Sequence, residues 1–198
     1  MNYLAHAYLS FGHKNVLVGN MISDYVKGKK QYDFPSEIQA GIQLHRAIDD
    51  FTDTHQTTKA VKEFFRKDYR LYAGAFVDVV YDYFLANDKN EFETAEKLNL
   101  FSRETYALLE IEQEYFPEKF AKIFPYMQEQ DWLYNYRTNE GMQKSFGGLA
   151  RRAKYIAETE TAYQVFLENK ETIQGYYNIF FPEIKVFVLH KMKTLLMN

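Results

Sequence analysis

The sequence GIQLHRAIDDFTDTH, residues 41–55, has the apolar spacing of a buried helix but interrupts that spacing with His45 and Asp49. At about 100° per residue, both residues fall within an arc of about 60° that includes Ile42. A buried carboxylate costs several kcal/mol unless a cation or a full set of hydrogen-bond donors compensates it. This stretch therefore predicts either a hydrogen-bonded pair that fixes helix packing or a cation site inside the fold.

A second interruption of this kind occurs in FVDVVYDYFL, residues 76–85, where Asp78 and Asp82 are the only carboxylates. One helical turn separates them, so both fall on the same face of a mostly apolar helix. Like charges on a buried face raise each other's pKa unless a divalent ion or cationic side chains lie between them. This pair therefore also favours a nearby cation.

Polar residues also interrupt two apolar segments near the start of the chain, with His6 in NYLAHAYL and with Asn20 and Asp24 in VLVGNMISDYV. An inward His taken alone is more often a hydrogen-bonded core residue than a metal ligand. Here, four predicted helices place oxygen or imidazole groups on apolar faces, as in the metal sites of helix bundles. Carboxylates and imidazoles without sulfur suit Mn²⁺, Fe²⁺ or Mg²⁺ better than structural Zn²⁺. We therefore expect a divalent metal centre, with a purely structural polar core as the alternative.

The rest of the sequence predicts an all-helical protein. Apolar residues follow helical spacing near residues 2–10, 15–28, 36–53, 57–67, 70–87, 92–115, 118–135, 139–153, 158–175 and 182–196. All four prolines follow phenylalanine, and because the residue before proline is pushed out of the α region, these pairs are predicted to mark element boundaries. No alternating strand pattern and no linker interrupts the chain. We predict one all-α domain, a helical bundle over residues 1–198.

Composition limits the classes of function. The formal net charge of -3 offers no broad basic excess to neutralise phosphates, so we expect no nucleic-acid binding. The absence of cysteine removes thiolate metal sites and thiol nucleophiles. No apolar stretch is long enough to span a membrane, and the opening MNYLAHAYLS lacks the features of a signal peptide. We therefore expect a cytoplasmic protein.

The segments that carry the polar residues follow one another in a specific order. They are MNYLAHAYLS at 1–10, GNMISDYVKGK at 19–29, GIQLHRAIDDFTDTH at 41–55, DVVYDYFL at 78–85 and, more weakly, GGLARRAKY at 147–155. In order and spacing, these segments resemble the acyl carrier protein phosphodiesterase family. Members of that family are regarded as divergent relatives of the HD-domain metallophosphohydrolases. The resemblance therefore implies an HD-like helical fold and a divalent metal bound by His and Asp.

The resemblance also implies hydrolysis of the phosphodiester that links 4′-phosphopantetheine to holo-acyl carrier protein. The implied metal is Mn²⁺, with Mg²⁺ or Fe²⁺ as alternatives, and its implied ligands are His6, Asp24, His45, Asp49 and Asp78. Asp24 or Asp82, whichever is not a ligand, would orient the attacking water as general base. Arg46 would hold a non-bridging phosphoryl oxygen by two hydrogen bonds, and its alternative is a solvated surface side chain.

An acidic carrier protein requires basic side chains near the site. Three short clusters are candidates: Lys27, Lys29 and Lys30; Arg66, Lys67 and Arg70; and Arg151, Arg152 and Lys154. The first cluster has the strongest claim because it follows Asp24 by only three to six residues. Clusters of this length are also typical of a solvated helix face.

Other functions remain open at this point. Tyr83 stands where relatives of the family often have His, which leaves room for a hydrolase of this fold acting on a small phosphodiester or nucleotide. A non-catalytic module that binds a carrier protein or another acidic partner is a further alternative. The segment DDFTD at 49–53 also matches the Asp-Asp-x-x-Asp signature of all-α isoprenoid synthases, a weaker alternative.

Overall fold

The computed structural model of the chain describes residues 1–197. The α-helices of this part are α1 Tyr3–Tyr8, α2 Lys14–Ile22, α3 Ser36–Thr54, α4 Gln56–Tyr69, α5 Ala73–Asn87, α6 Ala95–Ile111, α7 Glu118–Glu129, α8 Trp132–Asn135, α9 Asn139–Arg152 and α10 Glu160–Leu196. Short 3-10 helices occur at Ser23–Tyr25, Gly28–Asp33, Arg70–Tyr72 and Gln113–Tyr115. Because residues 1–197 contain no β-strand, the prediction of an all-α helical bundle is confirmed. None of the helices in this range is both long and apolar enough to cross a lipid bilayer.

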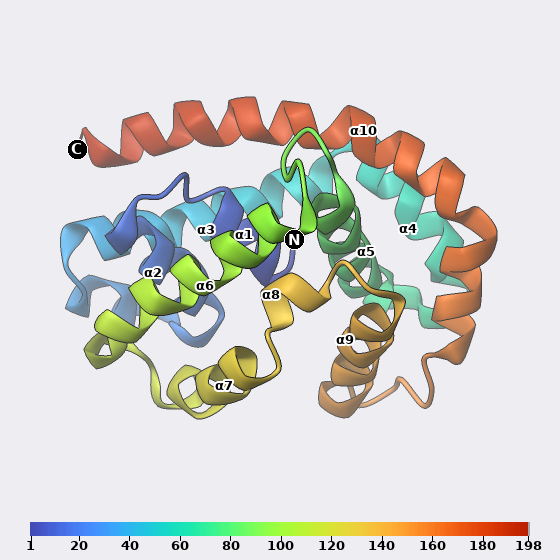
Figure 1. Cartoon of the computed structure of the whole chain (residues 1–198), viewed down its shortest axis with the longest axis horizontal. Helices are drawn as coiled ribbons and strands as arrows, with labels where there is room; N and C mark the ends of the chain where they lie inside the picture. Colours follow the sequence, from blue (N-terminus) through green and yellow to red (C-terminus); the bar gives the residue numbers. More distant parts are fainter. Residues whose placement is uncertain (198) are drawn as a thin grey trace.

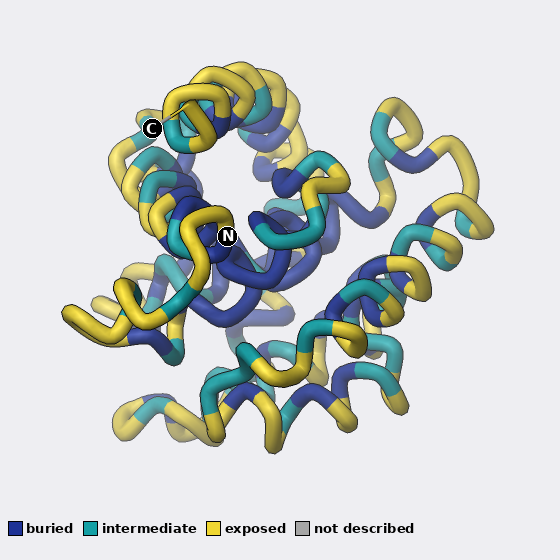
Figure 2. Tube along the Cα trace, turned by 90° about the vertical axis from the view of Figure 1, so that its left-hand side faces the viewer, coloured by how far each residue is buried: buried dark blue, intermediate teal, exposed yellow. Residues whose placement is uncertain are grey.

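The long helix α10 runs along one side of the molecule and packs against α3 and α4 (Figure 1). Helices α1 and α5 lie in the interior, where α1 contacts both α2 and α5. Helices α7, α8 and α9 form the opposite side, and α9 packs on α5. Figure 2 shows the buried positions gathered where the helices face one another, with the outer side of α10 exposed. The polar residues of α1, α2 and α3 are thereby brought to the middle of the fold.

Helices α2 and α3 cross at two glycines, with almost no space between their backbones. A Cβ atom built on Gly19 would lie 2.0 Å from the carbonyl oxygen of Ile38. A Cβ atom on Gly41 would lie 2.2 Å from the carbonyl oxygen of Val16 and 2.9 Å from the Cα of Gly19. No side chain larger than hydrogen fits at either position. The crossing brings Asn20, next to Gly19 on α2, against α3.

The Phe-Pro pairs divide into two kinds, so the prediction that all four mark boundaries is wrong for two of them. Pro35 and Pro117 directly precede α3 and α7, as predicted, whereas Pro125 and Pro182 lie inside α7 and α10. An internal proline costs a helix about 3 kcal/mol. Burial of the neighbouring apolar side chains, about 1.5–3 kcal/mol each, exceeds this cost.

The predicted helices 158–175 and 182–196 are in fact one helix, α10, which continues through Pro182. The residues around this proline, Phe180, Phe181 and Ile184, are all buried, so packing holds the helix together across it. The predicted helix 118–135 is instead divided into α7 and α8. The division lies at Asp131, whose left-handed backbone (φ 41°, ψ 60°) cannot continue an α-helix.

Candidate metal centre

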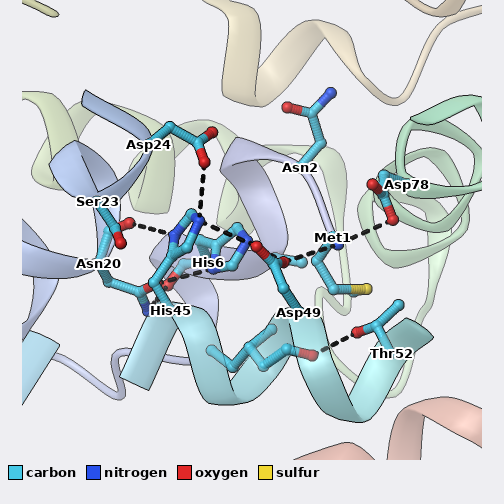
Figure 3. A network of polar contacts seen from close by, with 12 residues as sticks. Met1, Asn2, His6, Asn20, Ser23, Asp24, His45, Asp49, Thr52 and Asp78 are labelled. Atoms are coloured by element: carbon cyan, nitrogen blue, oxygen red, sulfur yellow. Dashed lines mark hydrogen bonds and ion pairs between the residues drawn. The ribbon is translucent and has the colours of Figure 1, made fainter. Parts of the chain in front are cut away.

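Two histidines from different helices form the floor of the site. The rings of His6, on α1, and His45, on α3, stack with their centroids 3.9 Å apart and their planes inclined by 13° (Figure 3). Both side chains are buried, with 3% and 6% of their surface exposed. The prediction that His45 faces inward is therefore confirmed.

Asn20 fixes the orientation of both rings. His45 Nδ1 lies 2.7 Å from the Asn20 backbone carbonyl, which can only accept, so this nitrogen donates a proton. His6 Nδ1 lies 2.8 Å from the side-chain oxygen of Asn20. The Asn20 amide nitrogen donates to the His6 carbonyl at 2.8 Å and to Ser10 Oγ at 3.1 Å, which settles which end of the amide is oxygen. Each ring therefore donates through Nδ1 and turns its Nε2 away from Asn20.

Both Nε2 atoms face the carboxylate of Asp49. The two Asp49 oxygens lie 3.2 Å from His6 Nε2 and 3.1 Å from His45 Nε2, and Asp24 approaches His45 Nε2 at 3.3 Å. Although burial opposes it, hydrogen bonding to Asp24 and Asp49 raises the pKa of His45 to about 9. Although partial burial opposes it as well, the hydrogen bond from His45 holds the pKa of Asp49 well below its usual range. Without a metal, His45 is therefore a protonated imidazolium between two carboxylates.

His6 is in the opposite state. Burial, together with the charge on His45, lowers the pKa of His6 to about 4, so its ring is neutral at pH 7. Because Nδ1 holds the single ring proton, Nε2 presents a lone pair to the carboxylate oxygen 3.2 Å away. Within residues 1–197, His6 Nε2 is the only buried side-chain nitrogen or oxygen without a hydrogen-bond partner. A cation held by Nε2 and the carboxylate, either a proton or a metal ion, would remove the repulsion between these two lone pairs.

The donor set fits a divalent metal ion. One ligand atom from each of His6, His45 and Asp49 lies within 4.8 Å of the others. Metal-bound histidines usually donate their second ring nitrogen to an oxygen that fixes the ring, and Asn20 supplies both such oxygens here. Two imidazoles and a carboxylate are ligands that bind divalent transition-metal ions in proteins. Of the five residues implied as ligands by the sequence, the structure brings these three together.

The other two implied ligands lie at the edges of this cluster. Asp24 contacts it only through His45, and the hydrogen bond from His45 lowers the pKa of Asp24. Asp78 is separated from Asp49 by the α-ammonium group of Met1, which lies 2.9 Å from Asp78 and 3.4 Å from Asp49 (Figure 3). Although burial opposes it, these two carboxylates raise the pKa of the ammonium to about 11. A cation of the chain itself thus lies between Asp49 and Asp78.

Asp82 binds the backbone at the start of α1, the helix that carries His6. It is fully buried and accepts backbone N–H bonds from Asn2 at 3.2 Å, Leu4 at 2.7 Å and Ala5 at 3.4 Å. Burial raises its pKa to about 7, against the opposing charge of Met1. Since backbone groups occupy both its oxygens, Asp82 anchors the start of α1 and does not face a substrate. Its candidate role as general base therefore has no geometric support.

Arg46 also differs from its expected placement. Its guanidinium donates to the Gln31 side chain at 2.8 Å and to the Val26 carbonyl at 3.1 Å. These two bonds hold the segment that carries Lys27, Lys29 and Lys30. All three lysines are exposed to solvent. Arg46 acts on the basic segment and does not point into the cluster.

The cluster opens toward solvent on its carboxylate side. Asp49 keeps 41% of its side chain exposed, although it lies on the same face of α3 as the buried His45, so the expectation that it is buried is only partly met. Asp24 is 68% exposed and Asp78 31%. The buried histidines therefore lie beneath an accessible rim of carboxylates, an arrangement that a substrate can reach.

A cleft of about 880 Å³ begins beside this rim. Its walls come from the N-terminal segment, Tyr25 and helices α7, α8 and α9, and they include Asn2, Tyr3, Trp132, Tyr136 and Gly148. Arg151 and Arg152, predicted from sequence as substrate-binding residues, both line it. The sequence did not predict the contribution of Tyr3 or Trp132, because aromatic residues are frequent throughout this chain and mark no particular site.

Comparison with known proteins identifies the family of this chain. The family model described as acyl carrier protein phosphodiesterase matches residues 1–184. The chain belongs to this family. Proteins named acyl carrier protein phosphodiesterase from Photorhabdus laumondii and Yersinia pestis are each 27% identical to it, over 92% and 96% of this chain and 92% and 99% of their own lengths. The protein of that name from Klebsiella pneumoniae strain 342 is 29% identical, over 93% of this chain and 95% of its own length. No solved structure matches the chain significantly.

The structure also shows where the last residues of the DDFTD pattern and Tyr83 lie relative to the metal-ligand candidates. Asp53, the last residue of the DDFTD pattern, forms an ion pair with Lys62 at 2.7 Å, and Asp50 is exposed away from the cluster. Tyr83, where relatives often have His, accepts a hydrogen bond from Lys170 of α10 at 2.7 Å and packs on Phe166. Asp50, Asp53 and Tyr83 are therefore not part of the His6–His45–Asp49 cluster.

Replacing Asn20 with Leu is expected to weaken Mn²⁺ binding about 10–100-fold, because His6 loses the acceptor that orients its ring. The affinity is measured by competition with a chelating dye. Asn15→Ala on the same helix is the matched control, since Asn15 bonds only to Glu37 at the surface. An unchanged affinity in Asn20→Leu would contradict the proposed orienting role.

Metal binding is expected to release about one proton at pH 7. His45 has a pKa of about 9 and must lose its Nε2 proton to coordinate, whereas His6 is already neutral. Apparent affinity should therefore rise about tenfold per pH unit up to pH 9. Calorimetric titration in buffers of different ionisation enthalpy gives the proton count directly, and a count near zero would rule out His45 as a ligand.

Proposed function

We propose that this protein hydrolyses the phosphodiester between 4′-phosphopantetheine and a serine of holo-acyl carrier protein, releasing 4′-phosphopantetheine and the apo-carrier. The observation that carries this proposal is the unpaired Nε2 of buried His6, held against the Asp49 carboxylate beside His45. Membership of the acyl carrier protein phosphodiesterase family supplies the substrate. Zero cysteines suit the cytoplasm, where we place the protein as part of the same proposal.

His6, His45 and Asp49 are the residues that would hold the divalent ion, and Mn²⁺ is the ion we favour. Such an ion supplies two effects when bound: it polarises a phosphoryl oxygen and lowers the pKa of water. The chain contributes the rest. Asn20 keeps both rings in one tautomer, and the stacked, buried rings hold their Nε2 atoms in fixed positions.

Asp24 is the residue that we assign as general base. Its side chain is exposed at the rim, and the hydrogen bond from His45 lowers its pKa, so it is ionised at neutral pH. An ionised carboxylate at this place can orient a water molecule and accept its proton as the water attacks phosphorus. Asp82 is the weaker candidate for this role, because it is fully buried and both its oxygens accept hydrogen bonds from backbone N–H groups.

Basic residues near the rim suit an acidic carrier protein. Lys27, Lys29 and Lys30 lie on the exposed segment that Arg46 fixes, directly after Asp24. Arg151 and Arg152 lie on α9 and line the cleft that adjoins the rim. Positive groups around the site speed association with an acidic partner even when the net charge of the chain is negative.

The test is intact-mass spectrometry of a holo-acyl carrier protein incubated with this protein and Mn²⁺, beside a sample with a chelator. The expected result is conversion to the apo mass in the presence of metal only. If the carrier stays at the holo mass while a chromogenic phosphodiester is hydrolysed, the substrate is instead a small phosphodiester. If neither is cleaved and the protein binds the carrier without metal, a non-catalytic binding module replaces the proposal.

A further inference from the structure

The cleft beside the metal centre has no assigned role in the reaction so far. It starts at Asn2 and Tyr3, which follow Met1 in the chain, and at Tyr25, which follows Asp24. Figure 3 shows the Asn2 side chain next to the cluster. Since Met1 contacts Asp49 and Asp24 contacts His45, the mouth of the cleft adjoins the proposed metal ligands.

The shape of the substrate restricts what can occupy this cleft. The phosphate that is cleaved carries two substituents, a folded carrier protein and a thin pantetheine chain. A folded protein docks on an outer surface, whereas a thin chain can enter a cavity. A volume of about 880 Å³ lies within the range that buries ligands of drug size, which pantetheine resembles.

The lining also matches the chemistry of that chain. Pantetheine alternates amide groups with methylene segments and a dimethyl group. Aromatic faces in the cleft come from Tyr3 and Trp132, whose rings lie 6.1 Å apart, and hydrogen-bonding groups come from Asn2 and Asn135. Among the charged residues that line the cleft, five are basic and one is acidic: Lys119, Lys122, Lys144, Arg151, Arg152 and Glu140. This basic excess suits a ligand that carries a phosphate group.

We propose that the cleft between α7, α8 and α9 holds the pantetheine arm while the phosphate lies at the His6–His45–Asp49 cluster. This inference rests on the proposed function for the identity of the arm. It adds a binding site at which Trp132 and Gly148 contact the arm and distinguish this substrate from phosphodiesters that lack it.

The chain provides a probe and a matched pair of variants. Trp132, in the wall of the cleft, is the only tryptophan, so its fluorescence reports on the cleft alone. Gly148, on α9, lines the cleft, and a Cβ atom there would meet nothing nearer than Arg151 at 3.7 Å. The preceding Gly147 does not line the cleft and has equal room, with its nearest neighbour at 3.8 Å. Both added side chains would approach Arg151, but only phenylalanine at Gly148 would start from the cleft wall and is expected to fill the cleft.

The experiment titrates 4′-phosphopantetheine into the wild type, Gly148→Phe, Gly148→Ala and Gly147→Phe while Trp132 fluorescence is recorded. We expect a saturable change in the wild type, retained in Gly147→Phe and Gly148→Ala, and an affinity at least tenfold weaker in Gly148→Phe. Circular dichroism and thermal melting check that each variant is folded. If Gly148→Phe does not fold, the wild-type titration still tests the inference, because the absence of a saturable change there would overturn it.

Two results would overturn the inference: no saturable change in the wild type, or equal affinity in Gly148→Phe and Gly147→Phe. The readout needs no turnover, so it separates the two proposals. If the wild type binds 4′-phosphopantetheine in the cleft but leaves holo-carrier intact, the proposed function fails and the cleft assignment stands. If the wild type cleaves holo-carrier and Gly148→Phe binds 4′-phosphopantetheine with wild-type affinity, the proposed function stands and the cleft assignment fails.

Discussion

Asp49→Asn is expected to lower kcat/KM for cleavage of holo-acyl carrier protein about a thousandfold or more. Among residues 1–197, Asp49 alone contacts both Nε2 atoms, so its loss removes the negative charge that would hold a cation there. A metal ion contributes several kcal/mol to the transition state, and about 4 kcal/mol corresponds to a thousandfold in rate. The rate is followed by intact-mass spectrometry at saturating Mn²⁺.

Asp50→Asn is the matched control for this change, because Asp50 lies next to Asp49 on α3 and is exposed. It alters the same charge on the same helix and should leave kcat/KM within about twofold of the wild type, since isolated surface charges contribute little. Equal activity of the two variants would remove Asp49 from the metal site.

Gly41→Ala is expected to destabilise the protein by about 3 kcal/mol or more, because the new Cβ would lie 2.2 Å from the Val16 carbonyl and must push α2 and α3 apart. For a chain of this size the melting temperature should fall by about 6–12 °C. Mn²⁺ affinity should fall as well, since Asn20 on α2 and His45 on α3 meet at this crossing. Thermal melting and dye competition measure the two effects.

Gly175→Ala shows what the same substitution does without a clash. Gly175 lies exposed on α10 with no atom within 4 Å of an added Cβ, so alanine should stabilise the helix by about 0.5–1 kcal/mol. A melting temperature of Gly41→Ala that stays at or above that of the wild type would contradict the close crossing of α2 and α3.

The helical spacing of apolar residues correctly predicted that certain polar side chains are buried. His6, His45 and Asn20 interrupt apolar faces, and each of them is buried in the fold. The family resemblance added the metal and the substrate, which periodicity cannot supply. The HD-like relationship stays a prediction, because no solved structure matches the chain significantly.

Other features depend on contacts that no local pattern encodes. The sequence placed Asp78 and Asp82 together with Asp49 as neighbours of one ion, but Met1 lies between Asp78 and Asp49, and the start of α1 takes both oxygens of Asp82. The continuity of α10 through Pro182 depends on tertiary packing that outweighs a local helix breaker. Helical periodicity predicts which face of a helix is buried, but not which distant group meets it.

If the proposed cluster binds a divalent ion in the cell, the proton on His45 would supply the positive charge there when metal is scarce. Held between Asp24 and Asp49, it keeps the carboxylates from repelling one another and leaves the ligands where an ion would find them. Under that proposal, the protein without metal would stay folded and would take up the ion by releasing the His45 proton, without refolding. The supply of metal, and not the synthesis of new chains, would set how much of the protein is active at a given time.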